Sequence, residues 1–227
     1  MVEILKSQGR SINSRVIQRA AQALIEGRVI VVPTETGYCF AGHSGIQGNH
    51  KTLLELRKAH PKNKPFSILC KDAKQVAAIS ELSTASYRIL NKLLPGPFTV
   101  ILPATRFTPK NVMGSFKNTV GVRITSHPIT TSLMAELDFP LIVTSVTDAE
   151  ELQDEGYLDD TYMDSLERWW TTAEGILSHT PKGLHLLIAG EEPLPMKMST
   201  ILDLSQEGHC TVLRDGGWTP EGLLESL

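Results

Sequence analysis

The sequence predicts an α/β fold, a sheet with helices on its faces, and three observations carry this prediction. Short apolar runs rich in β-branched residues, such as 28–32 and 141–144, are typical of buried strands. Other segments, such as 11–26, repeat apolar residues at helical spacing. The two kinds of segment are mixed along the chain and joined by short connections, which favours one sheet covered by helices.

The first elements are a helix at 11–26 and a strand at 28–32. Gly27 is well placed to end the helix, because glycine readily takes the left-handed conformation that follows a helix. The strand runs into Pro33, which cannot donate a hydrogen bond to a central ladder. We therefore expect pairing to stop at Pro33. The next side chains should then lie at a strand end, where open α/β sheets bind ligands.

The following helices are marked by their caps. Asn49 is expected to cap a helix over 49–59 that ends before Pro61, and Asp72 and Ser83 to cap helices over 72–79 and 83–94. A rigid turn is expected at residues 95–97, where a glycine stands between two prolines. Further helices are expected at 127–137 and 161–178, and further strands at 66–70, 98–102, 120–124, 141–144, 184–188, 199–204 and 210–214.

Composition narrows the class of protein. A chain of 227 residues with 41% hydrophobic residues suits one large domain, or one domain with an appendage. No apolar run approaches the roughly 20 residues that a membrane span needs, so we expect no membrane partner. The N-terminus lacks the layout of a signal peptide. Three widely spaced cysteines predict buried free thiols and a cytoplasmic location rather than a disulfide framework.

The net charge of −3 hides a strong asymmetry. Residues 148–174 hold ten acids and one base, a net charge of −9, so the rest of the chain carries +6. Residues 51–74 hold seven Lys or Arg and two acids. Such a region attracts phosphates or nucleic acid, or is simply a solvated helix and loop. The acidic segment is predicted to be an insertion, and either a lid over the site or a solvated surface excursion.

Polar side chains gather where the predicted strands end. They are Thr34, Thr36, Arg123, Thr144, Ser145, Thr147 and Arg214, joined by Lys58 and His60 after the second helix. This set offers cations and hydroxyls without an obvious nucleophile, base dyad or metal cage. It suits binding of anions and reaction by positioning and charge neutralisation, as in phosphoryl or nucleotidyl transfer. The chain has neither the Gly-x4-Gly-Lys-Ser/Thr phosphate loop nor the Gly-x-Gly-x-x-Gly dinucleotide motif.

Five motifs, taken in order, resemble those of the YrdC/YciO family, whose best-known members are threonylcarbamoyl-AMP synthases. They are Pro33-Thr34-Glu35-Thr36-Gly37-Tyr38, Lys58-Ala59-His60-Pro61-Lys62-Asn63-Lys64-Pro65, Leu94-Pro95-Gly96-Pro97-Phe98-Thr99, Thr119-Val120-Gly121-Val122-Arg123-Ile124 with His127-Pro128, and Ser199-Thr200-Ile201-Leu202-Asp203-Leu204 followed by Val212-Leu213-Arg214. The resemblance predicts a single YrdC-like domain over 11–217, with an acidic insertion at 148–174.

The resemblance implies a twisted mixed sheet of the YrdC/RibB-like kind with a large basic cavity. In the synthases, ATP, L-threonine and bicarbonate give pyrophosphate and threonylcarbamoyl-AMP, which serves the threonylcarbamoyladenosine modification of tRNA. Mg2+ would arrive with ATP. Further candidate partners are tRNA, double-stranded RNA and other tRNA-modification proteins. The residues implied are Thr34, Arg123 and Thr144 for threonine, Lys58, His60, Ser145, Thr147 and Arg214 for the nucleotide, and Thr36 and Ser199 as additional candidates.

Two motif positions depart from the synthase pattern. His60 stands where the family has the arginine of Lys-x-Arg, and a histidine is only partly charged at neutral pH. Thr147 stands where the family has the asparagine of Ser-x-Asn, and offers one hydroxyl in place of a carboxamide. The pattern is therefore closer to the YciO-like branch. Three functions stay open: a synthase, a paralogue acting on a related adenylate or carbamoyl compound, and a non-catalytic RNA or nucleotide binder.

Overall fold

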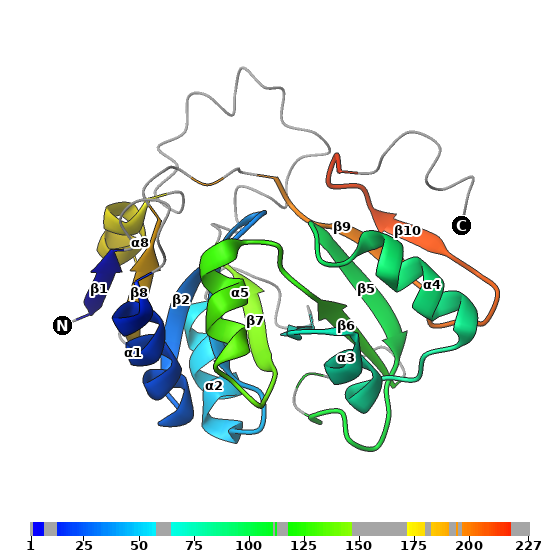
Figure 1. Ribbon diagram of the computed structural model, residues 1–227, viewed down its shortest axis with the longest axis horizontal. Coiled ribbons are helices and arrows are strands. Elements are labelled where there is room, and N and C mark those ends of the chain that lie inside the picture. Colours follow the sequence, from blue (N-terminus) through cyan, green and yellow to red (C-terminus); the bar gives the residue numbers. More distant parts are fainter. Residues whose placement is uncertain are drawn as a thin grey trace.

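The computed structural model describes residues 2–6, 13–57, 65–110, 112, 118–146, 172–179, 183–190, 194 and 197–218. Within them, ten strands form one mixed sheet with helices on both faces (Figure 1). The predicted α/β fold class is confirmed. Three predicted site residues, Lys58, His60 and Thr147, lie outside the described residues, as does the acidic segment up to residue 171.

The sheet combines parallel and antiparallel pairs. Parallel pairs join β8 to both β1 and β2, β4 to β6, and β5 to β9, and the other neighbours are antiparallel. The sequence predicted all of these strands except β1 and β3. In sheet order the strands are β1 (Glu3–Lys6), β8 (Leu184–Ala189), β2 (Val29–Thr34), β3 (Gly37–His43), β7 (Leu141–Ser145), β4 (Ser67–Leu69), β6 (Thr119–Arg123), β5 (Phe98–Pro103), β9 (Thr200–Asp203) and β10 (Thr211–Arg214).

The helices divide between the two faces of the sheet. One face carries α1 (Ser14–Ile25) and α5 (Pro128–Ala135), which pack on β8, β2, β3 and β7. Successive side chains of a strand point to opposite faces, so each face has its own buried cluster. No described helix covers the α1 face over β6, β5 and β9. The opposite face carries α2 (Gln47–Leu56), α3 (Ala73–Ile79), α4 (Thr84–Leu93) and α8 (Ala173–His179).

Three predicted helix boundaries are confirmed at atomic detail. The side chains of Asp72 and Ser83 each accept a hydrogen bond from the backbone N–H three residues further on, at 2.8 and 3.1 Å. Such bonds satisfy donors that the first helical turn leaves unpaired. Helix α1 is followed by Gly27, whose φ of 75° is left-handed, and the next N–H returns to the carbonyl of Ala23 at 2.9 Å.

The predicted cap at Asn49 is wrong. Helix α2 begins at Gln47, so Asn49 lies within the helix and is buried. With its amide oriented to satisfy both groups, it donates to the carbonyl of Gly27 at 2.7 Å and accepts from the N–H of His43 at 2.8 Å. A buried amide that finds partners in two other segments stabilises tertiary structure rather than the start of its own helix.

The predicted end of pairing at Pro33 is also wrong. Strand β2 continues to Thr34, and a hairpin pairs Pro33 with Tyr38 and Thr34 with Gly37. Because the last pair closes a two-residue hairpin, Pro33 occupies a position that exchanges no hydrogen bonds with β3. On its other side β2 pairs with β8 only as far as Val31. The missing proline N–H is therefore not needed by either neighbour.

The thiols are free, as the sequence predicted. Cys39 and Cys70 are buried and Cys210 is partly exposed. Burial raises the pKa of the Cys39 thiol, which keeps it protonated and weakly nucleophilic at neutral pH. Among the helices that the structure describes, none has the length and apolar character needed to cross a bilayer.

Candidate functional site

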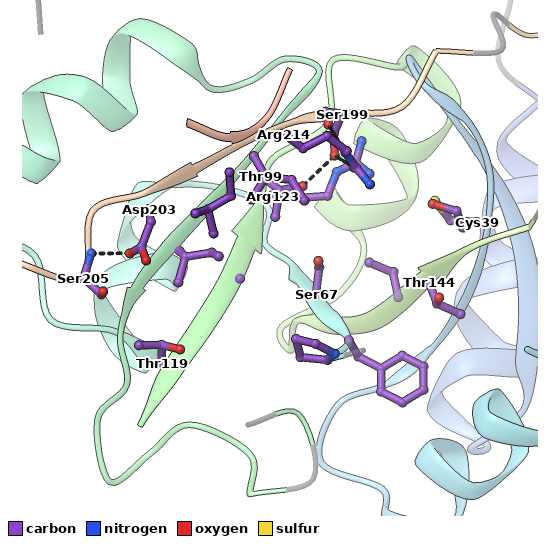
Figure 2. A pocket seen from close by; sticks show the side chains of 18 of the residues that line it. Cys39, Ser67, Thr99, Thr119, Arg123, Thr144, Ser199, Asp203, Ser205 and Arg214 are labelled. Carbon is purple, nitrogen blue, oxygen red and sulfur yellow. Dashed lines mark hydrogen bonds between the residues drawn. The ribbon is translucent and has the colours of Figure 1, made fainter. Parts of the chain in front are cut away.

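A cavity of about 630 Å3 opens on the sheet face that carries α1 and α5, in the region that these helices leave uncovered (Figure 2). Strands β3, β4, β5, β6, β7, β9 and β10 all contribute to its walls. The strand order therefore brings together side chains that are far apart in the sequence. Five predicted site residues line the cavity: Arg123, Thr144, Ser145, Ser199 and Arg214.

Arg123 is held rigidly at the wall of this cavity. It ends β6, and its side chain is only 6% exposed. Its Nη2 donates to Thr36 Oγ1 at 2.8 Å and to Glu35 Oε1 at 3.1 Å. Its Nε is buried and has no partner among the described residues. A buried donor without a partner costs about 1–3 kcal/mol, which a bound anion would offset.

Glu35 fixes Arg123 from behind the cavity wall. Its side chain is 13% exposed, and its second oxygen accepts from the Thr125 hydroxyl and from the Ser126 N–H, the latter at 3.2 Å. One carboxylate thus joins the tip of the β2–β3 hairpin, the end of β6 and the segment leading into α5. The sequence did not identify this role of Glu35.

Neither Thr34 nor Thr36 is among the residues that line the cavity. Thr34 is 1% exposed, and its hydroxyl donates to the carbonyl of Gly37 at 2.6 Å. The two threonine hydroxyls lie 3.1 Å apart. Since Thr36 accepts from Arg123, the geometry gives Thr34 a supporting role at the hairpin tip. Direct contact between Thr34 and threonine stays a prediction.

Arg214 enters the cavity from the outer strand β10. Its Nε and Nη2 donate to the carbonyl of Ser199 at 3.0 and 2.9 Å, and Nη2 also donates to the Ser199 hydroxyl at 3.0 Å. That hydroxyl lies 2.9 Å from the hydroxyl of Thr99. Burial, together with the nearby charge of Arg123, lowers the pKa of Arg214 to about 10. The two guanidinium groups therefore act on each other in a poorly solvated site.

Thr144 and Ser145 form the wall where β7 ends. Thr144 is half-buried and Ser145 is exposed, and Ser145 pairs with Cys39 in the ladder. These two hydroxyls offer hydrogen bonds without charge. Neither of them has a described base beside it, so the cavity presents binding groups rather than an activated nucleophile.

Several cavity residues were missed by the sequence analysis. Thr99, Thr119 and Asp203 line the cavity because each lies an even number of residues from another lining residue on its strand. That period of two is visible in the sequence, but its direction toward the cavity depends on the sheet order. Gly121 was a clearer signal, since glycine inside a strand often marks close approach of a ligand.

The basic region at 51–74 is only partly available for nucleic acid. Arg57 is 5% exposed, and its guanidinium lies 4.4 Å from the ring centroid of Phe66. The ammonium of Lys71 donates to the carbonyl of Leu137 at 3.1 Å. Two of the seven bases therefore make internal contacts. Among the described residues, no three His, Cys, Asp or Glu side chains are grouped to hold a metal ion.

The motif order of the sequence has a counterpart in a family model. The Sua5/YciO/YrdC model, described as "Telomere recombination", matches residues 22–157, which is more than half of the chain. The chain belongs to the Sua5/YciO/YrdC family. The resemblance inferred from the five motifs is thereby confirmed.

Relatives of this Sua5/YciO/YrdC protein include both YciO and synthases. An uncharacterised protein of Haemophilus influenzae is 27% identical over 203 residues, which cover 89% of this chain and 90% of the relative. YciO of Escherichia coli is 27% identical over 149 residues, covering 62% and 72%. The threonylcarbamoyl-AMP synthase of Hydrogenovibrio crunogenus is 33% identical over 137 residues, covering 57% and 70%.

Solved structures of the family share the fold of this chain. E. coli YciO has a TM-score of 0.75 at 24% identity, over 95% of this chain and 96% of its own. Sua5 of P. abyssi, solved in complex with L-threonine, has a TM-score of 0.76 at 22% identity, over 96% of this chain and 58% of its own. The twisted mixed sheet expected from the motifs is therefore confirmed.

Proposed function

We propose that this protein has L-threonylcarbamoyladenylate synthase-type activity, converting ATP, L-threonine and bicarbonate into threonylcarbamoyl-AMP and pyrophosphate. One observation carries the proposal. Arg123 and Arg214 face one cavity, close enough for the charge of one to help lower the pKa of the other. Glu35 is the one acid that pairs with either of them among the described residues. Confined positive charge of this kind is stabilised by bound anions, and carboxylate, bicarbonate and triphosphate are all anions.

The residues divide the work between the substrates. Arg123, held by Glu35 and Thr36, would bind the carboxylate of threonine, with Thr34 and Thr144 as further hydroxyl partners. Arg214, positioned by Ser199, would offset charge on the phosphates, together with Ser145. Lys58, His60 and Thr147, which the resemblance assigns to the nucleotide, would complete the phosphate site.

The reaction is a nucleotidyl transfer. The amine of threonine and bicarbonate first condense to a carbamate, which forms a C–N bond and releases water. A bond then forms between a carbamate oxygen and the α-phosphorus, and the bond from that phosphorus to pyrophosphate breaks. Negative charge spreads over the phosphoryl oxygens in the transition state, and a fixed guanidinium such as Arg214 would stabilise it. Glu35 already accepts three hydrogen bonds, and among the described residues no three His, Cys, Asp or Glu side chains are grouped to hold a metal ion. Mg2+ would therefore be held through the phosphates of ATP, where it neutralises charge.

The test is incubation with ATP, L-threonine, bicarbonate and Mg2+, followed by mass spectrometry for threonylcarbamoyl-AMP. The product should require all three substrates, and Arg123→Ala and Arg214→Ala should each reduce it at least 10-fold, since a hydrogen bond to a charged group contributes about 1.5–3 kcal/mol. Arg106→Ala is the matched control, because Arg106 is exposed and lies outside the cavity. Absence of product from a wild-type protein that binds AMP would contradict the proposal.

A second candidate is a YciO-like paralogue that makes or hydrolyses a related adenylate. It is favoured by the longer alignments with the H. influenzae protein and YciO than with the synthase. The same assay separates the two. AMP release from added threonylcarbamoyl-AMP, without synthesis from the three substrates, would support the paralogue.

A further inference from the structure

A second hollow lies between the end of α3 and the segment that follows β5 (Figure 1). Its volume is about 830 Å3, and it shares no lining residue with the cavity. Three alanines, Ile79 and Phe107 give it a mainly apolar lining. Glu81 and Arg106 are the two charged residues of that lining. We call this surface the α3 groove.

The segment that follows β5 is fixed to the end of α3. The Thr108 hydroxyl donates to the carbonyl of Ile79 at 2.5 Å and accepts from the N–H of Thr105 at 2.9 Å. The N–H of Thr108 donates to the carbonyl of Thr105 at 3.1 Å. On the other side of the groove, the N–H of Glu81 donates to the carbonyl of Pro103 at 2.9 Å. A segment held by these bonds loses little conformational entropy when a partner covers it, so it is preorganised for a contact.

This fixed segment projects an aromatic ring into solvent. Phe107 is 66% exposed, which is the highest value among the exposed large hydrophobic residues of the described chain. Its N–H donates to the Thr105 hydroxyl at 3.2 Å, and the Arg106 guanidinium lies 4.7 Å from the centroid of its ring. The guanidinium covers one side of the ring, so the other side is left for a partner. Aromatic residues and arginine are both enriched in protein interfaces.

The α3 groove carries both halves of a contact. A projecting ring stands beside an apolar hollow, and an acid stands beside a base. Glu81 and Arg106 are exposed, and neither forms an ion pair with another residue that the structure describes. A two-fold axis places each residue of such a surface against a different residue of the partner, and repeats the contact. Two copies would therefore bury each Phe107 in the opposite groove and pair each Arg106 with Glu81 of the partner.

A nucleic acid matches the α3 groove less well than a second copy does. Nucleic-acid binding requires an excess of basic side chains that neutralise phosphates. The lining of the groove has no net charge, because Glu81 offsets Arg106 and would repel phosphates. A second copy, in contrast, is complementary to the groove in both shape and charge.

We infer that the α3 groove is the interface of a two-fold symmetric homodimer, in which the Phe107 ring of each copy lies in the groove of the other. The dimer is weak, with a Kd of about 10–100 μM, since one ring and one groove from each copy make a small interface. The cavity and the groove share no lining residue, so the inference goes beyond the proposed function and does not depend on it.

Sedimentation equilibrium of the whole chain between about 1 and 200 μM tests this inference, because that range brackets the expected Kd. The average mass of the wild type should rise with concentration from that of a monomer toward that of a dimer. Phe107→Ala should raise the Kd roughly 100-fold, because each dimer loses the buried ring twice. Ile25→Ala is the matched control, since Ile25 is 54% exposed and lies outside the groove.

An exchange of charges tests the two-fold arrangement itself. Glu81→Arg and Arg106→Glu should each raise the Kd roughly 10-fold, because each variant brings like charges together twice. An equimolar mixture of the two variants should dimerise as the wild type does, since every charged contact of the mixed dimer again joins an acid to a base. Glu207→Arg is the control, because it makes the same change of charge at an exposed position outside the groove.

Four results would overturn the inference. The first is a wild type that stays monomeric over the whole range, and the second is a dimer that Phe107→Ala does not weaken. The third is a mixture of the two charge variants that does not recover the dimer, because the contact would then not be two-fold. The fourth is a monomeric wild type that binds a single-stranded RNA oligonucleotide and loses that binding in Phe107→Ala, which would assign the groove to nucleic acid.

Discussion

Replacing Glu35 with glutamine tests how much burial contributes to the ion pair between Glu35 and Arg123. The chain provides its own comparison, because a second pair joins Arg19 to Glu3. The two pairs have nearly equal lengths, 3.1 and 3.2 Å, but their side chains are 6% and 13% exposed in the first and 47% and 42% exposed in the second. Any difference between them therefore reflects burial and hydrogen bonding rather than distance.

The expected magnitudes follow from those environments. Breaking a buried pair by neutralising one partner costs about 3–5 kcal/mol, because a buried charge is left uncompensated. Glutamine at 35 would also turn an NH2 group toward donors, since Arg123, Thr125 and Ser126 all donate to the carboxylate. We expect Glu35→Gln to lower the free energy of unfolding by about 3 kcal/mol or more. Glu3→Gln should change it by less than about 1 kcal/mol.

Urea titration followed by circular dichroism measures both variants. Saturating phosphate should raise the unfolding free energy of Glu35→Gln more than that of the wild type. In the variant, the bound anion supplies the negative charge that Glu35 no longer provides to Arg123. Losses for Glu35→Gln and Glu3→Gln that agree within about 0.5 kcal/mol would refute the reasoning, since an exposed pair contributes less than about 1 kcal/mol. So would a variant that phosphate does not stabilise.

Three other changes should have distinct effects. Phosphate affinity should fall as the pH rises through about 10, because only the protonated Arg214 guanidinium binds an anion. Calorimetry should find no such fall in Arg214→Ala. A phosphate affinity of the wild type that does not change with pH would contradict this role of Arg214. Gly121→Leu should abolish AMP binding while the melting temperature changes little, and retained binding would mean that ligands do not approach β6. His60→Arg combined with Thr147→Asn should raise the rate of threonylcarbamoyl-AMP formation, with non-additive single effects; unchanged turnover with unchanged nucleotide affinity would place the defect elsewhere.

Much of the fold could be predicted because its signals are local. The strand at Val29–Thr34 is visible as a β-branched run, and α1 ends where Gly27 permits a left-handed turn. Asp72 and Ser83 cap helices through their own neighbours. Each of these features depends on residues within a few positions, so the sequence alone contains the information.

The missed features depend on distant partners. Strand β1 has four residues and pairs with β8, about 180 residues later in the chain, so no local pattern marks it. Asn49 resembles a cap until its partners in Gly27 and His43 are known. Pro33 resembles a strand end until the hairpin shows that its N–H is not needed.

The candidate site also contains residues that the sequence predicted and residues that it missed. The motifs identified Arg123 and Arg214, because arginine at a strand end is conspicuous in a sequence. They did not identify Glu35 as the partner that fixes Arg123, nor Asp203 as an acid that lines the cavity. Both assignments require the strand order and register, which arrange residues that are 88 positions apart in one case and 80 in the other.

The position of Arg214 on β10 affects how long a ligand can stay bound. Strand β10 has four residues, pairs with β9 alone among the described strands, and shifts register between Val212 and Arg214. Such edge segments detach by local opening far more often than central strands, which separate from their neighbours only when the whole sheet unfolds. A ligand held by both arginines connects this edge to the central strand β6. We therefore expect the residence time of such a ligand to be limited by the rate at which β10 detaches from β9.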